Sequence, residues 1–408
     1  MHAVSVPRPA AERPPAAAPR PRHLGAVDVI RVVTVVGVVA VHSIAGTSLA
    51  DSLPAGAAMI VLHVNRAVFF LLTALVLTYS LGARRLRLRT FYARRYSLVV
   101  TPYVAWTLIY FFFNGELHSP ARAALHRLAG ELATGSARFN LYFLLVTMQI
   151  YLVFPLLLWF VRASRGHHRL VFALSLAMQL GFVTAVHYRL PLPGLLGAWA
   201  QYPDTALASY QLYVVTGALA ADHLDELTAW VRRHGGAIAA GCACAVLLSE
   251  VSYLRDIYAG GLAPLDASQV FQPVVVMDSL AAFLGLFTLG VSWADRRRPL
   301  KFDRLIGEGS RRSFGVFLAH PLLLQAVLWL GSSWGLLTLL QRAPASATLA
   351  VGLGFVVPLV LLLSWAFVGL AMRSPLTLPI TGRRRTSGAF VAGTGPRRGL
   401  LPRRQDGF

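Results

Sequence analysis

Hydrophobic runs of about 20 residues recur along almost the whole chain, and each is long enough to cross ~30 Å of bilayer hydrocarbon as a helix. Ten such runs can be placed, at 27–47, 55–81, 96–114, 141–161, 169–187, 205–221, 236–254, 272–293, 313–332 and 347–371. The run at 205–221 is the shortest. Because the runs are continuous rather than alternating, they favour helices over barrel strands. The sequence predicts an all-α, polytopic membrane bundle of about ten transmembrane helices.

Composition supports this reading. Hydrophobic residues make up 56% of the 408 residues and charged residues only 13%, about half the charged fraction of a typical soluble domain. The two cysteines, Cys242 and Cys244, lie two positions apart in an apolar run and therefore point in different directions. We interpret them as small core residues, and no metal site is predicted.

The distribution of basic residues predicts the orientation of the chain. Of the 38 Lys and Arg residues, 30 fall in segments that ten spans place on one side and six on the other. This asymmetry is typical of cytoplasmic loops, so both termini are expected in the cytoplasm of a multi-pass plasma-membrane protein. The net charge of +21 is then a consequence of topology and of attraction to anionic lipid, and no nucleic-acid partner is expected.

Three regions follow from this layout. A basic, Pro/Ala-rich tail is predicted at 1–24, a transmembrane domain at 25–372, and a disordered Arg-rich tail at 373–408. Cleavage of the first run as a signal peptide after Ala50 is an alternative. Arg31 inside that run, and the need for a cytoplasmic start, argue against it.

Charged groups inside hydrocarbon are costly and mark candidate functional positions. Arg31 and His42 are eleven residues apart in the first run, which puts them on one helix face, separated by roughly 16 Å along the axis. Asp28 precedes Arg31 by one turn and can pair with it. Arg31 could instead extend to the inner headgroups, and His42 could be a packed core residue.

Arg66 lies about ten residues, or roughly 15 Å, below the outer surface in the second run and needs a partner. Asp278 and Glu250, both in the outer halves of their runs, are the predicted carboxylates, and the pairing could be purely structural. His320 is predicted about seven residues inside its run, at a depth comparable with that of Arg31.

Several motifs, in order from about residue 26 to 322, resemble those of the acyltransferase family three membrane O-acyltransferases. They are Asp28-Val29-Ile30-Arg31 with His42-Ser43, Arg66-Ala67-Val68-Phe69-Phe70, Phe91-Tyr92-Ala93-Arg94-Arg95 with Pro102, Leu141-Tyr142-Phe143-Leu144 with Gln149-Ile150-Tyr151 and Phe154-Pro155, Gly217, and Ser313 with His320-Pro321. Thr73-Ala74 and Asn140 depart from the family pattern.

The resemblance implies an enzyme that moves an acyl group, acetyl being the expected one, from cytoplasmic acyl-CoA to a hydroxyl of an extracytoplasmic or lipid-linked acceptor. It assigns the CoA phosphates to Arg31, supported by Asp28, with Arg94, Arg95 and His320 nearby. His42 would be the general base or an acyl-carrying nucleophile.

Around His42, Arg66 or Asn65 would stabilise the oxyanion. Asp278 or Glu250 would either orient the His42 ring or neutralise Arg66. The expected partners are therefore the bilayer, acyl-CoA and an acceptor such as a surface polysaccharide, a cell-wall sugar, a glycolipid or a natural product.

A transporter or flippase of a charged or acylated solute is the alternative, because intramembrane Arg, His and Asp also line transport paths. Repeated halves, which many transporters have, were not found in the sequence.

Overall fold

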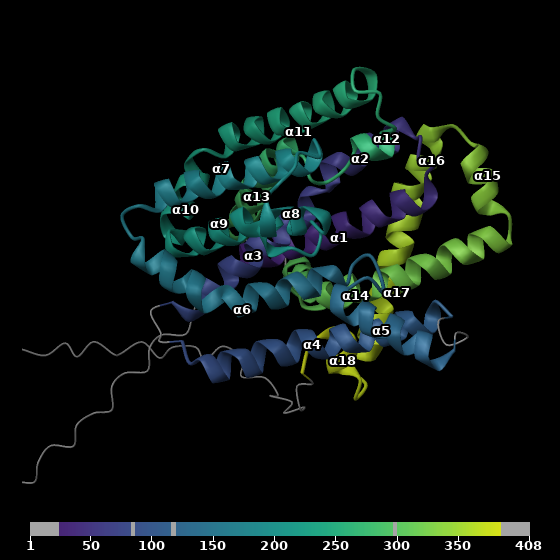
Figure 1. Ribbon diagram of the computed structural model, residues 1–408, viewed down its shortest axis with the longest axis horizontal. Coiled ribbons are helices and arrows are strands. Elements are labelled where there is room, and N and C mark those ends of the chain that lie inside the picture. The colour runs from purple at the N-terminus through teal and green to yellow at the C-terminus, as the bar shows by residue number, and fades with distance from the viewer. Residues whose placement is uncertain (1–23, 83–85, 116–119, 297–299, 385–408) are drawn as a thin grey trace, which may run out of the picture.

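The computed structural model describes residues 24–82, 86–115, 120–296 and 300–384, and in this part of the chain every regular element is helical (Figure 1). The first half comprises α1 (Gly25–Thr47), α2 (Leu53–Leu62), α3 (Val64–Leu81), α4 (Leu88–Phe113), α5 (Ala121–Thr134), α6 (Tyr142–Ala163), α7 (His168–His187), α8 (Gly194–Gln201), η2 (Leu207–Tyr210) and α9 (Gln211–Asp222). The second half comprises α10 (Leu224–Arg233), α11 (Gly235–Tyr258), α12 (Pro264–Ala267), α13 (Pro273–Asp295), α14 (Leu300–Ser333), α15 (Leu336–Arg342), α16 (Ala345–Val351), η3 (Gly352–Val356), α17 (Val357–Ala371) and α18 (Thr377–Thr381).

Nine helices of the described chain are long and apolar enough to cross a membrane, which confirms the predicted all-α membrane bundle. The second span is α2 and α3 together, joined at His63, and the last span is α16, η3 and α17 together. The shortest predicted run becomes α9, which has 12 residues. At 1.5 Å per residue α9 is about 18 Å long, less than the thickness of the hydrocarbon.

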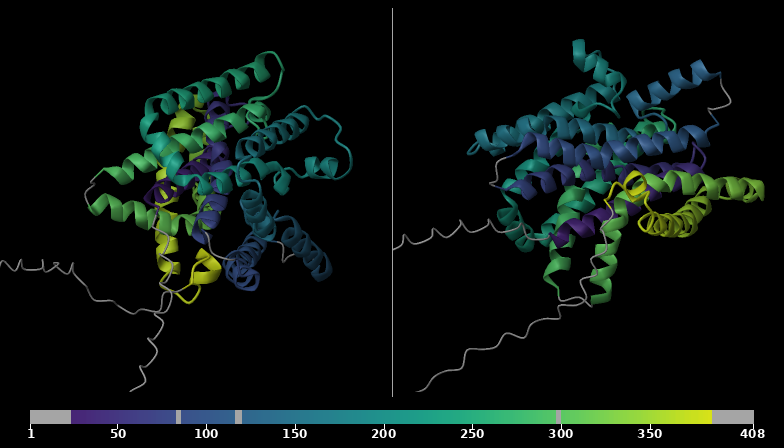
Figure 2. Two further views of the ribbon diagram at one scale, coloured as in Figure 1. Left: turned by 90° about the vertical axis from the view of Figure 1, so that its left-hand side faces the viewer. Right: turned by 90° about the horizontal axis from the view of Figure 1, so that it is seen from below.

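Helix α1 forms the centre of the bundle, packed against α3, α13, α14 and α17. Its apolar residues supply much of the main core, and α7, α10 and α11 lie on one side of it, with α4 and α18 on the other (Figures 1 and 2). Arginines gather where α4 begins and where α6 and α10 end. We call this the arginine-rich end, and it carries Arg94, Arg95, Arg162, Arg165, Arg232 and Arg233.

Two predicted boundaries differ from the structure. Helix α14 begins at Leu300, thirteen residues before the predicted run, and its 34 residues extend well beyond the apolar segment. Residues 373–384, predicted as part of a disordered tail, include α18, which packs on α4, α14 and α17. The indole Nε1 of Trp106 donates to Ile380 O at 3.1 Å, and this partly buried hydrogen bond helps to fix the segment. The predicted tail residues 1–23 and 385–408 lie outside the described residues.

Gly217 allows a close approach between α9 and α3. A Cβ added there would overlap the backbone oxygen of Leu71, and a backbone atom cannot rotate away. We therefore expect Gly217→Ala to lower the free energy of unfolding by about 1–3 kcal/mol, as overpacking does.

Thermal unfolding in detergent checks this prediction, with Gly181→Ala in α7 as the matched control. Nothing lies within 4 Å of a Cβ at Gly181, and alanine favours helix more than glycine does. Equal unfolding midpoints for the two variants would contradict the packing argument.

Candidate active site

A pocket of about 610 Å³ is bordered by five arginines from separate parts of the chain. These are Arg31 of α1, Arg95 of α4, Arg311 of α14, and Arg383 and Arg384 of the segment after α18. Apolar side chains, Phe314 and Met372 among them, complete the wall. We call this cavity the basic pocket. Its cations and apolar surface suit an anionic ligand with an extended, less polar part.

Arg31 and Asp28, one turn apart on α1, both lie at the basic pocket. Arg31 lines the basic pocket, and the buried Asp28 accepts a hydrogen bond from Ser310 Oγ at 2.6 Å. The Asp28 carboxylate also attracts the Arg31 guanidinium electrostatically. Asp28 thus joins α1 to α14 at the pocket and keeps Arg31 in place.

Only one of the two adjacent arginines in α4 reaches the pocket. Arg95 lines it, whereas Arg94 is exposed and is absent from the lining. Both residues belong to a regular helix, where successive side chains differ by about 100° in direction. Of the two arginines predicted to contact the ligand, only Arg95 therefore lines the basic pocket.

The arginines of the basic pocket repel one another. Burial, followed by the charges of Arg31 and Arg311, lowers the pKa of the Arg383 guanidinium from its ordinary value. Glu308 offsets part of this charge through ion pairs with Arg311 and Arg312. An incoming polyanion would relieve the remaining repulsion, which favours anion binding here.

His42 lies in a second, smaller cavity of about 100 Å³. We call it the His42 chamber; among the side chains that line it are His42, His63, Asn65, Arg66, Phe139 and Asn140. The imidazole of His42 packs on Phe139, with ring centroids 4.0 Å apart, and stacks on His320 at 5.4 Å. Within the described chain, neither ring nitrogen of His42 makes a hydrogen bond, so both are available to a substrate.

His320 therefore lies beside His42 rather than at the depth of Arg31, and that part of the prediction is wrong. The apolar run suggested that the helix enters the membrane near residue 313, but α14 starts at Leu300 and its Ser310 is level with Asp28. Ten residues further along α14, the ring of His320 lies beside that of His42.

Pro321 explains how His320 is held. Proline has no N–H, so the carbonyl oxygen of Phe317, four residues earlier, lacks the backbone N–H that it would accept in a regular helix. Instead it accepts the Nδ1–H of His320 at 2.8 Å and the Nδ2–H of Asn140 at 2.9 Å. A carbonyl can only accept, so the proton of the neutral His320 ring is on Nδ1. Its Nε2 is buried and has no hydrogen-bond partner in the described structure.

We expect His320 to act as a positioning residue for His42, because this hydrogen bond fixes its ring beside that of His42. We expect His320→Ala to lower turnover roughly tenfold to hundredfold, because a misplaced reacting group has that effect, while the KM for the acyl donor stays unchanged. His320→Asn, which keeps a donor near Nδ1, should restore most of the rate. Steady-state kinetics of both variants check this, and an Asn variant as slow as the Ala variant would contradict the role of the Nδ1 hydrogen bond.

Arg66 has a different partner from the one predicted. Its Nη1 lies 2.5 Å from Asp204 Oδ1 and donates to Tyr210 Oη at 3.1 Å. The guanidinium also lies over the rings of Tyr142, at 5.6 Å, and Phe271, at 5.2 Å. A guanidinium carries five N–H donors, so Arg66 retains donors for a substrate in the chamber.

The predicted roles of Asp278 and Glu250 are consequently not supported. Asp278 is only 3% exposed and lies beside Ser249 and Glu250, where α13 packs on α11. Neither carboxylate pairs with Arg66, and neither lines the His42 chamber. The loop before α9 supplies Asp204 instead, because α9 is short and its preceding segment folds over Arg66.

The basic pocket and the His42 chamber share one wall. Phe69 of α3, Phe143 of α6 and Phe317 of α14 line both cavities. Their ring centroids are 5.8 Å apart for Phe69 and Phe143, 4.9 Å for Phe143 and Phe317, and 6.2 Å for Phe69 and Phe317. We call these three residues the aromatic wall. Three aromatic side chains, which can change rotamer, thus border both the cationic pocket and the chamber of His42.

Sequence reasoning missed several residues of this site, namely Asn140, Asp204, Tyr210, Arg311 and Arg383. Asn140 and Arg311 lie inside or next to motifs that pointed to the site. The others lie in segments predicted as a loop, a weak span and a tail, and no local pattern marks them.

Comparison with known families agrees with these features. Residues 24–369 match the model of acyltransferase family 3, described as an acyltransferase domain. No curated protein and no solved structure matches the chain. The match includes α1 to α17 almost completely, and thus every helix that supplies His42, His320 and the aromatic wall. The chain is a multi-pass membrane enzyme that belongs to acyltransferase family 3.

Proposed function

We propose that the protein transfers an acyl group, acetyl being the simplest, from cytoplasmic acyl-CoA to a hydroxyl of an acceptor on the other side of the membrane. The acceptor class we favour is a glycan, a glycolipid or a hydroxylated natural product. The observation that carries the proposal is the shared aromatic wall, which connects a cationic pocket to a histidine chamber through the middle of the bundle.

The basic pocket suits the CoA part of the donor. CoA carries several phosphate charges, and Arg31, Arg95 and Arg383 lie around one cavity where charge-assisted hydrogen bonds to phosphate are strong. In the predicted topology this end of the bundle faces the cytoplasm, where CoA is available. Arg31 and His42 are separated by roughly 16 Å along α1, comparable to the reach of a pantetheine arm. The thioester would then pass between the rings of the aromatic wall.

His42 would act as the general base. Its neutral imidazole removes the proton from the acceptor hydroxyl as the oxygen attacks the thioester carbonyl. The C–O bond forms, the C–S bond breaks, and the proton passes from the imidazolium to the leaving thiolate. Stacking on His320 and Phe139 fixes the plane of the ring. In the competing mechanism His42 itself takes the acyl group and passes it on.

Arg66 and Asn65 are the groups placed to stabilise the oxyanion, since both line the His42 chamber. Asn65 is held by a hydrogen bond from Nδ2 to Leu62 O at 2.5 Å, and Arg66 by Asp204 and Tyr210. Donors that are fixed before the reaction stabilise developing charge most effectively. Asp278, which lies between α11 and α13, has no role in this chemistry.

Release of free CoA from labelled acetyl-CoA by the purified protein in lipid tests the proposal. We expect release that depends on a hydroxylated acceptor, with the label recovered as an alkali-labile ester. Longer acyl-CoAs assayed in parallel identify the preferred chain. Release of CoA with no ester product in any acceptor mixture would contradict O-acylation. Movement of an acylated solute across the vesicle without thioester consumption would favour transport instead.

A further inference from the structure

A third cavity, of about 720 Å³, lies near the arginine-rich end and shares no residue with the two cavities of the active site. It is formed where α7, α9 and α13 meet, with the start of α10 at its rim. We call it the α7–α13 groove. The proposed acyl transfer makes no use of this groove, so the groove needs a separate explanation.

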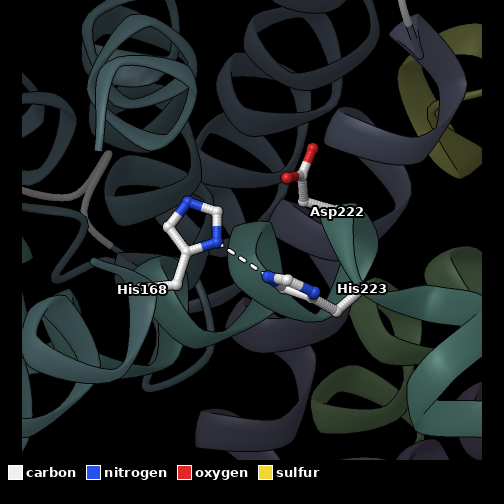
Figure 3. A group of neighbouring side chains, drawn as sticks. All are labelled: His168, Asp222 and His223. Atoms are coloured by element: carbon white, nitrogen blue, oxygen red, sulfur yellow. Dashed lines mark hydrogen bonds between the residues drawn. The ribbon is translucent and has the colours of Figure 1, made fainter. Parts of the chain in front are cut away.

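The rim of the groove is polar and held by hydrogen bonds (Figure 3). His168 Nδ1 and His223 Nε2 lie 2.8 Å apart, His168 Nε2 donates to Val161 O at 2.8 Å, and His223 Nδ1 lies 2.9 Å from Glu226. Asp222 is paired with Arg165 at 3.0 Å. His168, Asp222 and His223 are close enough together to bind a metal. However, every ring nitrogen already has a partner, so we interpret this cluster as a rigid rim.

The rim carries one cation without a counterion. Arg165 is balanced by Asp222, and His223 is next to Glu226. Arg169 lines the groove, is exposed, and makes no ion pair within the described residues. A single arginine at the mouth of a groove between transmembrane helices is suited to an anionic headgroup.

The interior of the groove is apolar and contains one polar group. Phe172, Leu280, Phe283 and Leu284 form its walls. Thr216 of α9 also lines it, and its buried Oγ1 has no hydrogen-bond partner in the described structure. Thr216 is seven residues from His223, or about 10 Å along the helix. A hydroxyl at this depth requires an acceptor, because an unpaired buried polar group is unfavourable.

We propose that the α7–α13 groove binds one anionic phospholipid. Arg169 binds the phosphate, Thr216 donates to an ester carbonyl one layer deeper, and one acyl chain covers Phe172 and Phe283. The groove thus offers a cation, a hydroxyl donor and an apolar wall, which are the groups that the phosphate, ester and acyl chain of a lipid require. Such a lipid would also fill the space beside α9, whose length of about 18 Å is shorter than the hydrocarbon.

Native mass spectrometry of the protein tests this, with phosphatidylglycerol and phosphatidylcholine of identical acyl chains as probes. The wild type should retain one phosphatidylglycerol in preference to phosphatidylcholine. Arg169→Gln should reduce that preference about fivefold, the effect of one basic residue near a membrane surface. Arg233→Gln is the matched control, since Arg233 lies exposed at the same end, outside the groove, and it should leave the preference unchanged.

A second variant tests the acyl-chain part of the proposal independently of charge. Ala220 lines the groove on α9, and Ala220→Leu should lower the occupancy of both lipids by filling it. An equal loss of preference in the Arg169 and Arg233 variants would show that the preference depends only on the overall positive charge of this end, and it would overturn the proposal. Unchanged phosphatidylglycerol occupancy in Ala220→Leu, or a wild type without preference between the lipids, would do the same.

Discussion

Replacing His42 by alanine is expected to lower acyl-CoA turnover by about 10²–10⁴-fold, the usual contribution of a general base. His42 lies in the chamber with no hydrogen bond to either ring nitrogen in the described structure, and its ring contacts those of His320 and Phe139. Removal of the imidazole would leave His63 and His320 as the nearest titratable rings, neither of them at the position of the His42 ring. The acyl donor should still bind, because the basic pocket is unchanged.

Acceptor-dependent CoA release by the wild type and by His42→Ala, at saturating donor, measures this effect. His167→Ala is the control, because His167 is exposed just before α7 and lines neither the basic pocket nor the His42 chamber; its rate should match that of the wild type. A His42→Ala variant that keeps most of the activity would remove His42 from the mechanism.

The wild type and His42→Ala can also be used to distinguish the two possible roles of His42, general base and nucleophile. Incubation with labelled acyl-CoA in the absence of acceptor, followed by rapid denaturation, should leave no label on the chain if His42 is a general base. Label that is retained by the wild type and absent from His42→Ala would establish the acyl-histidine route instead.

Replacing Arg31 by glutamine is expected to raise the KM for acyl-CoA about tenfold to hundredfold with a smaller change in kcat. A hydrogen bond to a charged group contributes about 1.5–3 kcal/mol, and 1.4 kcal/mol corresponds to a factor of ten. Arg31 lines the basic pocket and is kept in place by the buried Asp28. The loss should be ground-state binding of the CoA part rather than chemistry at His42.

Arg94→Gln is the matched control for Arg31→Gln. Arg94 lies at the same end of the bundle as Arg95 but is exposed and outside the basic pocket, so its KM should be close to that of the wild type. Donor titrations at two salt concentrations check both variants. The same increase in KM for Arg31→Gln and Arg94→Gln would show that the effect comes from the overall positive charge of the arginine-rich end rather than from binding in the pocket.

Much of the fold could be predicted from the sequence because it depends on local physics. A run of about 20 apolar residues has few alternatives to a transmembrane helix, and nine such helices are found. Within one helix, spacing alone determines direction, so Arg31 and His42 could be placed at two depths on one face of α1. The predictions that Arg31 lies at a basic position and His42 at a separate, deeper one depend only on this geometry.

The contacts between helices could not be predicted in this way. Arg66 required a carboxylate, and the sequence offered Asp278 and Glu250 at suitable depths. The partner is Asp204, 138 positions away in a loop, because depth does not determine which side of a helix faces a neighbour. The depth of His320 was misjudged for a related reason, since α14 continues as a helix beyond its apolar run.

The sequence by itself determined the class of the protein, the approximate position of nine of its ten predicted spans, and the shared face of Arg31 and His42 on α1. Only the tertiary structure decided that five arginines from four separate segments line one pocket, that the carbonyl freed by Pro321 holds His320 beside His42, and that three phenylalanines border both cavities. The first set follows from the transfer of each segment from water to lipid. The second set depends on packing between segments up to some 350 residues apart, for which a single sequence carries no local signal.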